Sequence, residues 1–162
     1  MTRSSFDFAP VVLYVSYRAE GSPDQKYKLK EPSLTESKRE GFCSMTWVIT
    51  KLCADCQDTA CVKVCPVDCI YGLTVDDGSY RKQLFIDPNE CIDCAACEPE
   101  CPYGAIFQDQ EVPELFQEDT QINAQVFQDH TKDDFTTKPE PIREHPSQEV
   151  VEENYRKWGY QK

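Results

Sequence analysis

The sequence predicts a small α+β fold built from two similar halves, each a cysteine-bearing loop followed by a turn of helix and a short antiparallel strand. Two runs of cysteines, each ending in a Cys-Pro pair, are the first observation behind this prediction. The second is an internal repeat, because residues 61–70 (CVKVCPVDCI) align with residues 97–106 (CEPECPYGAI). The third is that nine of the ten cysteines lie within residues 53–101, where long apolar runs are few. Such a segment is typical of a fold stabilised by metal ligation in place of a large core.

Residues 1–44 differ in character from the rest and are expected to be an N-terminal extension. They contain one isolated cysteine, Cys43, and a polar Lys/Glu/Ser/Pro stretch. Two interpretations stay open for them, a disordered arm or the product of a start codon assigned too far upstream. The second makes Met45 the physiological start, since Glu40 and Gly41 must be encoded by a purine-rich string that resembles a bacterial ribosome-binding site.

Residues 45–108 are expected to form the domain that carries the cysteines. A strand over residues 45–50 should pair with residues 105–107. A hairpin should leave at residues 70–71 and return at 84–86, because the Asp-Asp-Gly-Ser stretch at 76–79 is a good turn signal.

Residues 109–130 are expected to form a helical lid over the core that holds the cysteines, with Pro113 in a first helical turn and Thr120 capping a second turn. Residues 131–162 carry several prolines and are interpreted as an extended C-terminal tail. The end of this tail could form a short helix, because Ser147 is a suitable N-cap. Three apolar residues follow at helical spacing, Val151, Tyr155 and Trp158.

The formal net charge of −12 is concentrated on the cysteine-bearing part of the chain. Residues 45–130 carry four Lys or Arg against sixteen Asp or Glu, whereas the two ends are close to neutral. An acidic surface of this kind repels nucleic acid and anionic membranes and favours redox partner proteins with basic docking patches. We expect a cytoplasmic monomer, since no signal peptide pattern and no apolar stretch of about 20 residues is present. A disulfide framework is the alternative for so many cysteines, but their close spacing disfavours it.

The second cysteine run has the spacing C-x2-C-x2-C-x3-C-P, by which bacterial proteins hold cubane iron–sulfur clusters. In this pattern Cys91, Cys94 and Cys97 bind three corners of a [4Fe–4S] cluster. The fourth cysteine of each run serves the other cluster. Cys65 is therefore the predicted fourth ligand here, and Cys101 is predicted to join the first run.

The first run is two residues longer, C-x2-C-x4-C-x3-C-P, and this should move Cys56 away from the cluster. Three thiolates then remain, from Cys53, Cys61 and Cys101, and three thiolates suit a [3Fe–4S] cluster. The alternative is that Cys56 completes a fourth corner and gives an eight-iron form. Zinc is a further alternative, because C-x2-C pairs also build tetrahedral zinc sites.

Residues from about Thr46 to Asp129, roughly half of the chain, resemble the seven-iron bacterial ferredoxins of the ferredoxin I type. The similarity lies in four strings, CVKVCPVDC at 61–69, DPNECIDCAACEPECP at 87–102, AIF at 105–107 and EVP at 111–113. The resemblance implies the two-cluster ferredoxin fold, with βαβ-type cluster loops related by a pseudo-twofold axis, and the ligand roles just given. It also implies that Cys56 and Cys69 bind no iron. The chain differs from the family pattern in residues 1–44, in a longer segment at 71–85 and in the tail after residue 129.

The resulting functional hypothesis is a soluble, low-potential one-electron carrier and not an enzyme. The six glycines are scattered, so no dinucleotide fingerprint or P-loop is present, and no cluster of bases and nucleophiles is evident. Two alternatives remain, an electron-wire subunit of a larger oxidoreductase and a regulator that uses the three-iron site or Cys69 to sense oxidants or iron.

Overall fold

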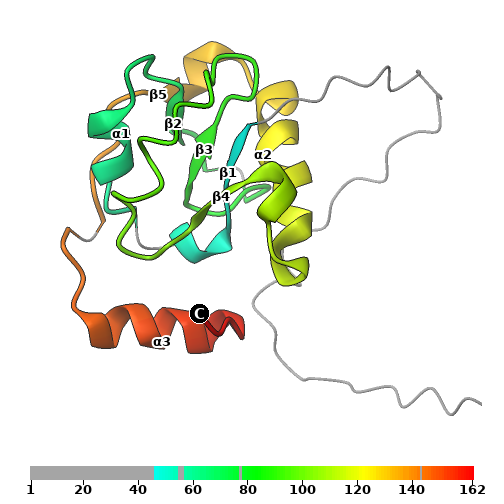
Figure 1. The fold of residues 1–162 in the computed structure, drawn as a ribbon. Helices are drawn as coiled ribbons and strands as arrows, with labels where there is room; N and C mark the ends of the chain where they lie inside the picture. The colour runs from blue at the N-terminus through cyan, green and yellow to red at the C-terminus, as the bar shows by residue number, and fades with distance from the viewer. Residues whose placement is uncertain (1–45, 55–56, 77, 143) are drawn as a thin grey trace, which may run out of the picture.

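A computed structural model describes residues 46–54, 57–76, 78–142 and 144–162. The predictions for Met45, Cys43 and Cys56 lie outside the described residues. Within them, the chain forms two small antiparallel sheets with helices around them (Figure 1). This arrangement of mixed helices and antiparallel strands agrees with the α+β class that the sequence predicts.

The first sheet joins the start of the domain to the end of the second cysteine run. Strand β1 (Trp47–Ile49) pairs with β4 (Ile106–Gln108), and Ile49 lies opposite Ile106. The predicted pairing is confirmed. The chain just before the first cysteine run therefore lies beside the chain just after the second run.

The second sheet contains the predicted hairpin. Strand β2 (Ile70–Leu73) pairs with β3 (Leu84–Ile86), with Ile70 opposite Ile86. The inward side chains Ile70, Leu84 and Ile86 are each 1% exposed, so this hairpin contributes the centre of the core.

A third strand of this sheet comes from the tail that the sequence analysis interpreted as extended. Residues Phe135–Thr136 form β5, which pairs with Gly72 and Leu73 of β2. The backbone N–H of Thr74 also donates to the carbonyl of Asp134 at 2.8 Å. The tail therefore returns to the domain directly after residue 131.

The two halves of the repeat share a backbone feature beyond their cysteines. Helix α1 (Ala60–Val64) contains Cys61 and ends just before Cys65, and residues 96–100 form turns at the matching place in the second run. Asp68 and Gly104 occupy equivalent positions after the two Cys-Pro pairs, and both have a φ of 53°. Asparagine, aspartate and glycine tolerate this left-handed conformation best.

Helix α2 (Gln117–Asp129) follows two short 3₁₀ turns at Asp109–Glu111 and Glu114–Phe116. The prediction of a cap at Thr120 is wrong, because this residue lies inside the helix. The helix packs against β1 and β3, where Ile122 and Val126 are buried, and contributes no lining residue to the two cysteine cavities described below. It is thus a lid over the strands and not over the cysteines.

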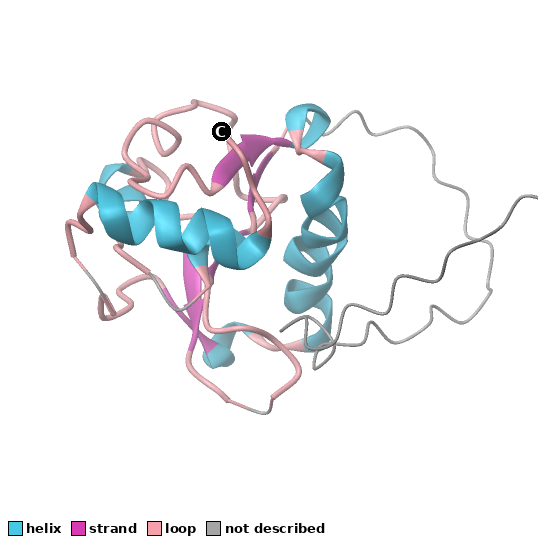
Figure 2. Ribbon diagram, turned by 90° about the horizontal axis from the view of Figure 1, so that it is seen from below, coloured by secondary structure: helices cyan, strands magenta, loops and turns pink. Residues whose placement is uncertain are grey.

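The last helix, α3 (Gln148–Trp158), begins after Ser147 as predicted and ends at Gly159, whose φ of 70° is the usual glycine stop. It packs against the 3₁₀ turn Lys51–Cys53 and buries Trp158. Figure 2, seen from below, shows α3 lying across the underside of the domain. Among the described residues, no helix is long and apolar enough to cross a membrane.

Candidate iron–sulfur cluster sites

The described cysteines gather around two separate cavities. The first is called here the five-cysteine cavity. It is lined by the cysteines Cys65, Cys69, Cys91, Cys94 and Cys97. All four cysteines predicted for the [4Fe–4S] site are thus together, and Cys65 arrives there from the other cysteine run.

The second cavity is called here the three-cysteine cavity. Its cysteines are Cys53, Cys61 and Cys101, the predicted [3Fe–4S] set, and Cys101 is the member from the other run. Within the described residues, no three His, Cys, Asp or Glu side chains converge closely enough to hold a single metal ion. The thiols instead surround cavities, as a ligand set for a cluster of several atoms would.

Cys69 is the extra thiol of the five-cysteine cavity. It is 3% exposed, and its Sγ lies 3.5 Å from Sγ of Cys65. Hydrogen bonding to Cys91, followed by burial, raises the pKa of the Cys69 thiol. The same contact with Cys69 lowers the pKa of Cys91 to about 6. Cys69 is therefore placed as an S–H donor beside sulfur atoms that would bind as thiolates.

Burial dominates the ionisation of several other predicted ligands. It raises the pKa of Cys61 and of Cys97 to about 12, and neighbouring cysteines add to the effect. The pKa of Cys101 is also raised, again chiefly by burial. Because iron binds the thiolate form, filling these cavities with a cluster would release protons.

Backbone amides close to these sulfur atoms complete the donor set. The N–H of Ala105 donates to Sγ of Cys101 at 3.3 Å, and backbone N–H groups of Asp93 and Trp47 contribute to the low pKa of Cys91. The left-handed residues Asp93 (φ 55°) and Ala95 (φ 60°) curve the chain between Cys91 and Cys97. Such N–H donors are characteristic of iron–sulfur sites, where they help to set the potential.

Trp47 supplies a specific test of whether the five-cysteine cavity suits a cluster. Its side chain is 7% exposed and lines the cavity, yet its indole Nε1 has no hydrogen-bond partner among the described residues. A buried N–H group without a partner costs free energy, and the sulfide of a cluster would be an acceptor for it. Thiols and a spare donor around one cavity fit an iron–sulfur cluster. The sequence pattern predicts only an apolar strand residue at Trp47 and gives no sign of this donor.

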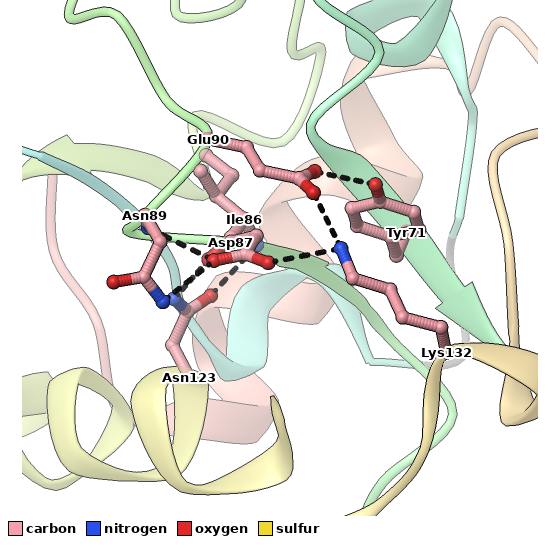
Figure 3. A network of polar contacts seen from close by, with 7 residues as sticks. All are labelled: Tyr71, Ile86, Asp87, Asn89, Glu90, Asn123 and Lys132. Atoms are coloured by element: carbon pink, nitrogen blue, oxygen red, sulfur yellow. Dashed lines mark hydrogen bonds and ion pairs between the residues drawn. The ribbon is translucent and has the colours of Figure 1, made fainter. Parts of the chain in front are cut away.

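A polar network holds the loop that leads to Cys91 (Figure 3). Asp87 accepts from the N–H of Asn89 at 2.9 Å, and its carbonyl accepts from the N–H of Cys91 at 3.0 Å. Lys132 lies 3.4 Å from the Asp87 carboxylate and also pairs with Glu90. On the other side, α2 contributes Asn123, which hydrogen-bonds both backbone groups of Ile86 at 3.0 and 2.7 Å.

Lys132 changes the electrostatics of this network. Its ammonium, followed by the hydroxyl of Tyr71 at 2.5 Å, lowers the pKa of Glu90. The same pairing with Glu90 raises the pKa of Lys132. No local sequence signal pointed to Lys132, because it lies in the tail, 42 residues after its partner Glu90.

The C-terminal segment covers the loop of the three-cysteine cavity. The N–H of Ile142 donates to the carbonyl of Gln57 at 3.2 Å, and the N–H of His145 donates to the carboxylate of Asp58 at 2.8 Å. From α3, the Nδ2 of Asn154 donates to the carbonyl of Leu52 at 2.8 Å. Leu52 adjoins Cys53, and Asp58 itself lines the cavity.

The tail also meets the turn after Cys101. A Cβ atom at Gly104 would lie 3.3 Å from the hydroxyl of Tyr155 and 3.3 Å from Nζ of Lys162. A side chain at position 104 would therefore displace two flexible side-chain ends, in addition to adopting a left-handed φ. Cys53 and Cys61 are only 7% and 6% exposed under this cover, whereas Cys94 of the five-cysteine cavity is exposed.

A buried ion pair fixes the start of the first cysteine loop to α2. Asp119 is fully buried, accepts the backbone N–H of Lys51 at 2.9 Å, and lies 3.3 Å from the guanidinium of Arg81. Its carboxylate therefore connects the turn before Cys53, the hairpin and the helix. Burying such a pair is costly by itself, but removing one partner is costlier still.

Comparisons with known proteins place this geometry in a family. A family model described as a 4Fe-4S dicluster domain matches residues 52–105. The chain is 48% identical over 101 residues to Ferredoxin Fdx8 of Sorangium cellulosum, an alignment that covers 55% of this chain and 94% of that protein.

The chain belongs to the bacterial ferredoxins. This ferredoxin is also 45% identical over 83 residues to Ferredoxin 7Fe of Hydrogenibacillus schlegelii, covering 51% of the chain and 97% of that protein. It is 44% identical over 84 residues to a ferredoxin of Streptomyces griseus, covering 52% and 73%. Ferredoxins carry electrons with iron–sulfur clusters and are not enzymes by themselves. The chain is accordingly an iron–sulfur electron carrier that binds a [4Fe–4S] cluster.

Proposed function

We propose that this ferredoxin transfers single electrons between partner proteins and holds one [4Fe–4S] and one [3Fe–4S] cluster in the two-cluster fold of the seven-iron ferredoxins. The ligands of the [4Fe–4S] cluster are Cys65, Cys91, Cys94 and Cys97. Those of the [3Fe–4S] cluster are Cys53, Cys61 and Cys101. When bound, each cluster supplies a centre that accepts or gives one electron, at a potential set by charge, hydrogen bonding to sulfur and exposure.

The observation that carries the proposal is the division of the described thiols between two cavities, with one cysteine exchanged between the two runs. A three-thiol set supports a three-iron cluster at one end. The name of the relative from Hydrogenibacillus schlegelii, Ferredoxin 7Fe, supports the same assignment.

Cys69 is proposed to remain a free thiol. Four thiols suffice for a [4Fe–4S] cluster, and Cys69 is the member of the five-cysteine cavity that is placed as a donor to Cys65 and Cys91. Cys56 and Cys43 are proposed to bind no iron. The protein residues thus bind, orient and partly shield the clusters, and none is assigned a role in substrate chemistry.

The cluster assignment can be tested on the purified full chain by iron and sulfide analysis together with electron paramagnetic resonance. We expect the oxidised protein to show the signal of one [3Fe–4S] cluster per chain. The same signal should persist in the Cys56→Ala variant, and Cys69→Ala should retain both clusters. A diamagnetic oxidised protein that gains its three-iron signal only in Cys56→Ala would show that Cys56 is a fourth ligand and would refute the seven-iron proposal.

A further inference from the structure

The two ends of the ferredoxin differ in how closely another protein can approach the cysteine cavity at each end. At the five-cysteine cavity, the side chain of Cys94 is exposed. At the three-cysteine cavity, Cys53 and Cys61 are buried, and the C-terminal segment is hydrogen-bonded over their loop. Electron transfer between proteins slows steeply as the gap between the centres widens. A partner can therefore come closest to a cluster beside Cys94.

An apolar surface surrounds this accessible cysteine. Val67 is 39% exposed and Ile92 is 58% exposed, and Ala95 is exposed as well. All three line the five-cysteine cavity together with Cys94, so they lie on one stretch of surface. We call these four residues the docking patch. Exposed apolar side chains grouped in this way are characteristic of the centre of a protein interface.

The chain segments that build the docking patch carry charge of a single sign. Residues 64–70 and 88–102 contain five acidic residues and no Lys or Arg. The acidic residues are Asp68, Glu90, Asp93, Glu98 and Glu100. Lys132 pairs with Glu90, whereas Asp68, Glu98 and Glu100 are exposed. The expected partner surface is therefore basic around an apolar centre.

We propose that the docking patch is the surface through which this ferredoxin exchanges electrons with a partner protein whose own redox centre lies behind apolar residues framed by lysine or arginine. The proposal rests on the electron-carrier function proposed above and adds to it which end of the molecule is used. The covered three-cysteine end does not face the partner.

The test uses stopped-flow reduction of oxidised cytochrome c, a basic haem protein, by the reduced, cluster-loaded full chain. One electron passes from the ferredoxin to the haem iron, so the ferredoxin is oxidised and the cytochrome is reduced. Two double variants change the net charge equally. Glu98→Lys with Glu100→Lys alters two exposed acids of the segment 88–102, which also carries Ile92, Cys94 and Ala95 of the patch. Glu114→Lys with Glu118→Lys alters exposed acids at the 3₁₀ turn before α2 and in its first turn, which line neither cavity.

We expect the Glu98/Glu100 pair to lower the second-order rate constant about tenfold at low salt, because oriented charges accelerate encounter by this order or more. The Glu114/Glu118 pair should lower it less than about threefold, and the difference between the pairs should fade as salt is added. Equal rate constants for the two pairs, or a larger loss in the Glu114/Glu118 pair, would overturn the proposal.

The apolar part of the patch is tested at high salt with Ile92→Ser against Leu115→Ser, a second exposed apolar residue, 48% exposed, on the turn before α2. A lower rate constant only for Ile92→Ser supports the patch, and equal rate constants reject its apolar component. Cluster absorbance is recorded first, so that a failure of the electron-carrier function can be distinguished from a failure of the docking patch. A wild-type protein without reducible clusters would contradict the electron-carrier function, whereas intact clusters with no dependence on the Glu98/Glu100 pair would contradict only the docking patch.

Discussion

The five-cysteine and three-cysteine ends of this ferredoxin are built by the same repeat, yet they differ in what lies over them. The first has the regular cysteine spacing, an exposed cysteine in Cys94 and a small apolar surface. The second has the lengthened loop, two buried cysteines in Cys53 and Cys61, a half-buried Cys101 and a C-terminal segment hydrogen-bonded across the loop. The comparison shows that segments outside a repeated cysteine motif can give its two copies different environments. Here those segments are the tail and α2.

The two crossing cysteines give the largest expected difference between the ends. Cys101→Ala should lose the three-iron cluster, because no further described cysteine lines its cavity. Cys65→Ala should keep a four-iron cluster, since Sγ of Cys69 lies 3.5 Å from that of Cys65 and can take its place. Iron content and electron paramagnetic resonance would measure both. Complete loss of the four-iron cluster in Cys65→Ala would show that Cys69 cannot reach it.

The next largest effects are expected for substitutions of Asp119 and Asn123, the two α2 residues that hold neighbouring segments. Asp119→Ala removes the acid that pairs with buried Arg81 and accepts from Lys51, and should cost about 3–5 kcal/mol of unfolding free energy. Asn123→Ala, which frees both backbone groups of Ile86, should cost about 1–3 kcal/mol. Denaturant unfolding of the cluster-loaded protein, followed by cluster absorbance, checks the order. An Asp119→Ala variant as stable as the wild type would mean that this ion pair does not hold the first loop.

The tail can be removed to test whether it shields one end only. A chain ending after Pro141 loses the three hydrogen bonds made by Ile142, His145 and Asn154. Each is worth about 1 kcal/mol, so a chelator should remove the three-iron cluster at least about fivefold faster. The four-iron cluster should be lost at the unchanged rate.

Point variants separate this shielding from a general loss of stability. Asn154→Ala should accelerate loss of the three-iron cluster, whereas Gln148→Ala, which removes only an exposed contact with Glu152 on the same helix, should not. Equal acceleration of both clusters in the truncated chain would indicate general destabilisation instead of a local cover.

The smallest effect is expected at Lys132, which is exposed and acts at the five-cysteine end. Lys132→Ala should raise the pKa of Glu90 toward its ordinary value, as measured by NMR titration. A carboxylate whose pKa is lowered by folding stabilises the protein above its unfolded-state pKa, and this contribution is lost as the pH falls through the lowered value. Because both partners are near solvent, the loss at neutral pH should be below about 1 kcal/mol. Lys138→Ala, at another exposed lysine of the tail, is the control and should leave the pKa of Glu90 unchanged.

Much of the fold could be predicted from the sequence because its signals are local. The Asp-Asp-Gly-Ser stretch and the apolar residues around it predicted that residues 70–71 pair with residues 84–86, and Ser147 predicted the start of α3. The cysteine groups of both cavities followed from spacing and from the exchange between runs. Their roles as ligands stay predictions.

The parts that could not be predicted depend on contacts between distant segments. Strand β5 has only two residues and forms because Gly72 and Leu73 offer it an edge, so it has no pattern of its own. Lys132 lies in a charged stretch that looks like any solvated segment until the chain returns it to Glu90. The position of α2 over the strands was likewise missed, because its apolar residues predict a buried face without saying what that face contacts.

The most direct test of the central claim is Mössbauer spectroscopy of the oxidised, ⁵⁷Fe-labelled full chain. The account predicts two sets of signals, one from a [3Fe–4S] and one from a [4Fe–4S] cluster, with areas in the proportion of three irons to four. The Cys61→Ala variant should lose the first set and retain the second. A wild-type spectrum containing only [4Fe–4S] signals would contradict the account.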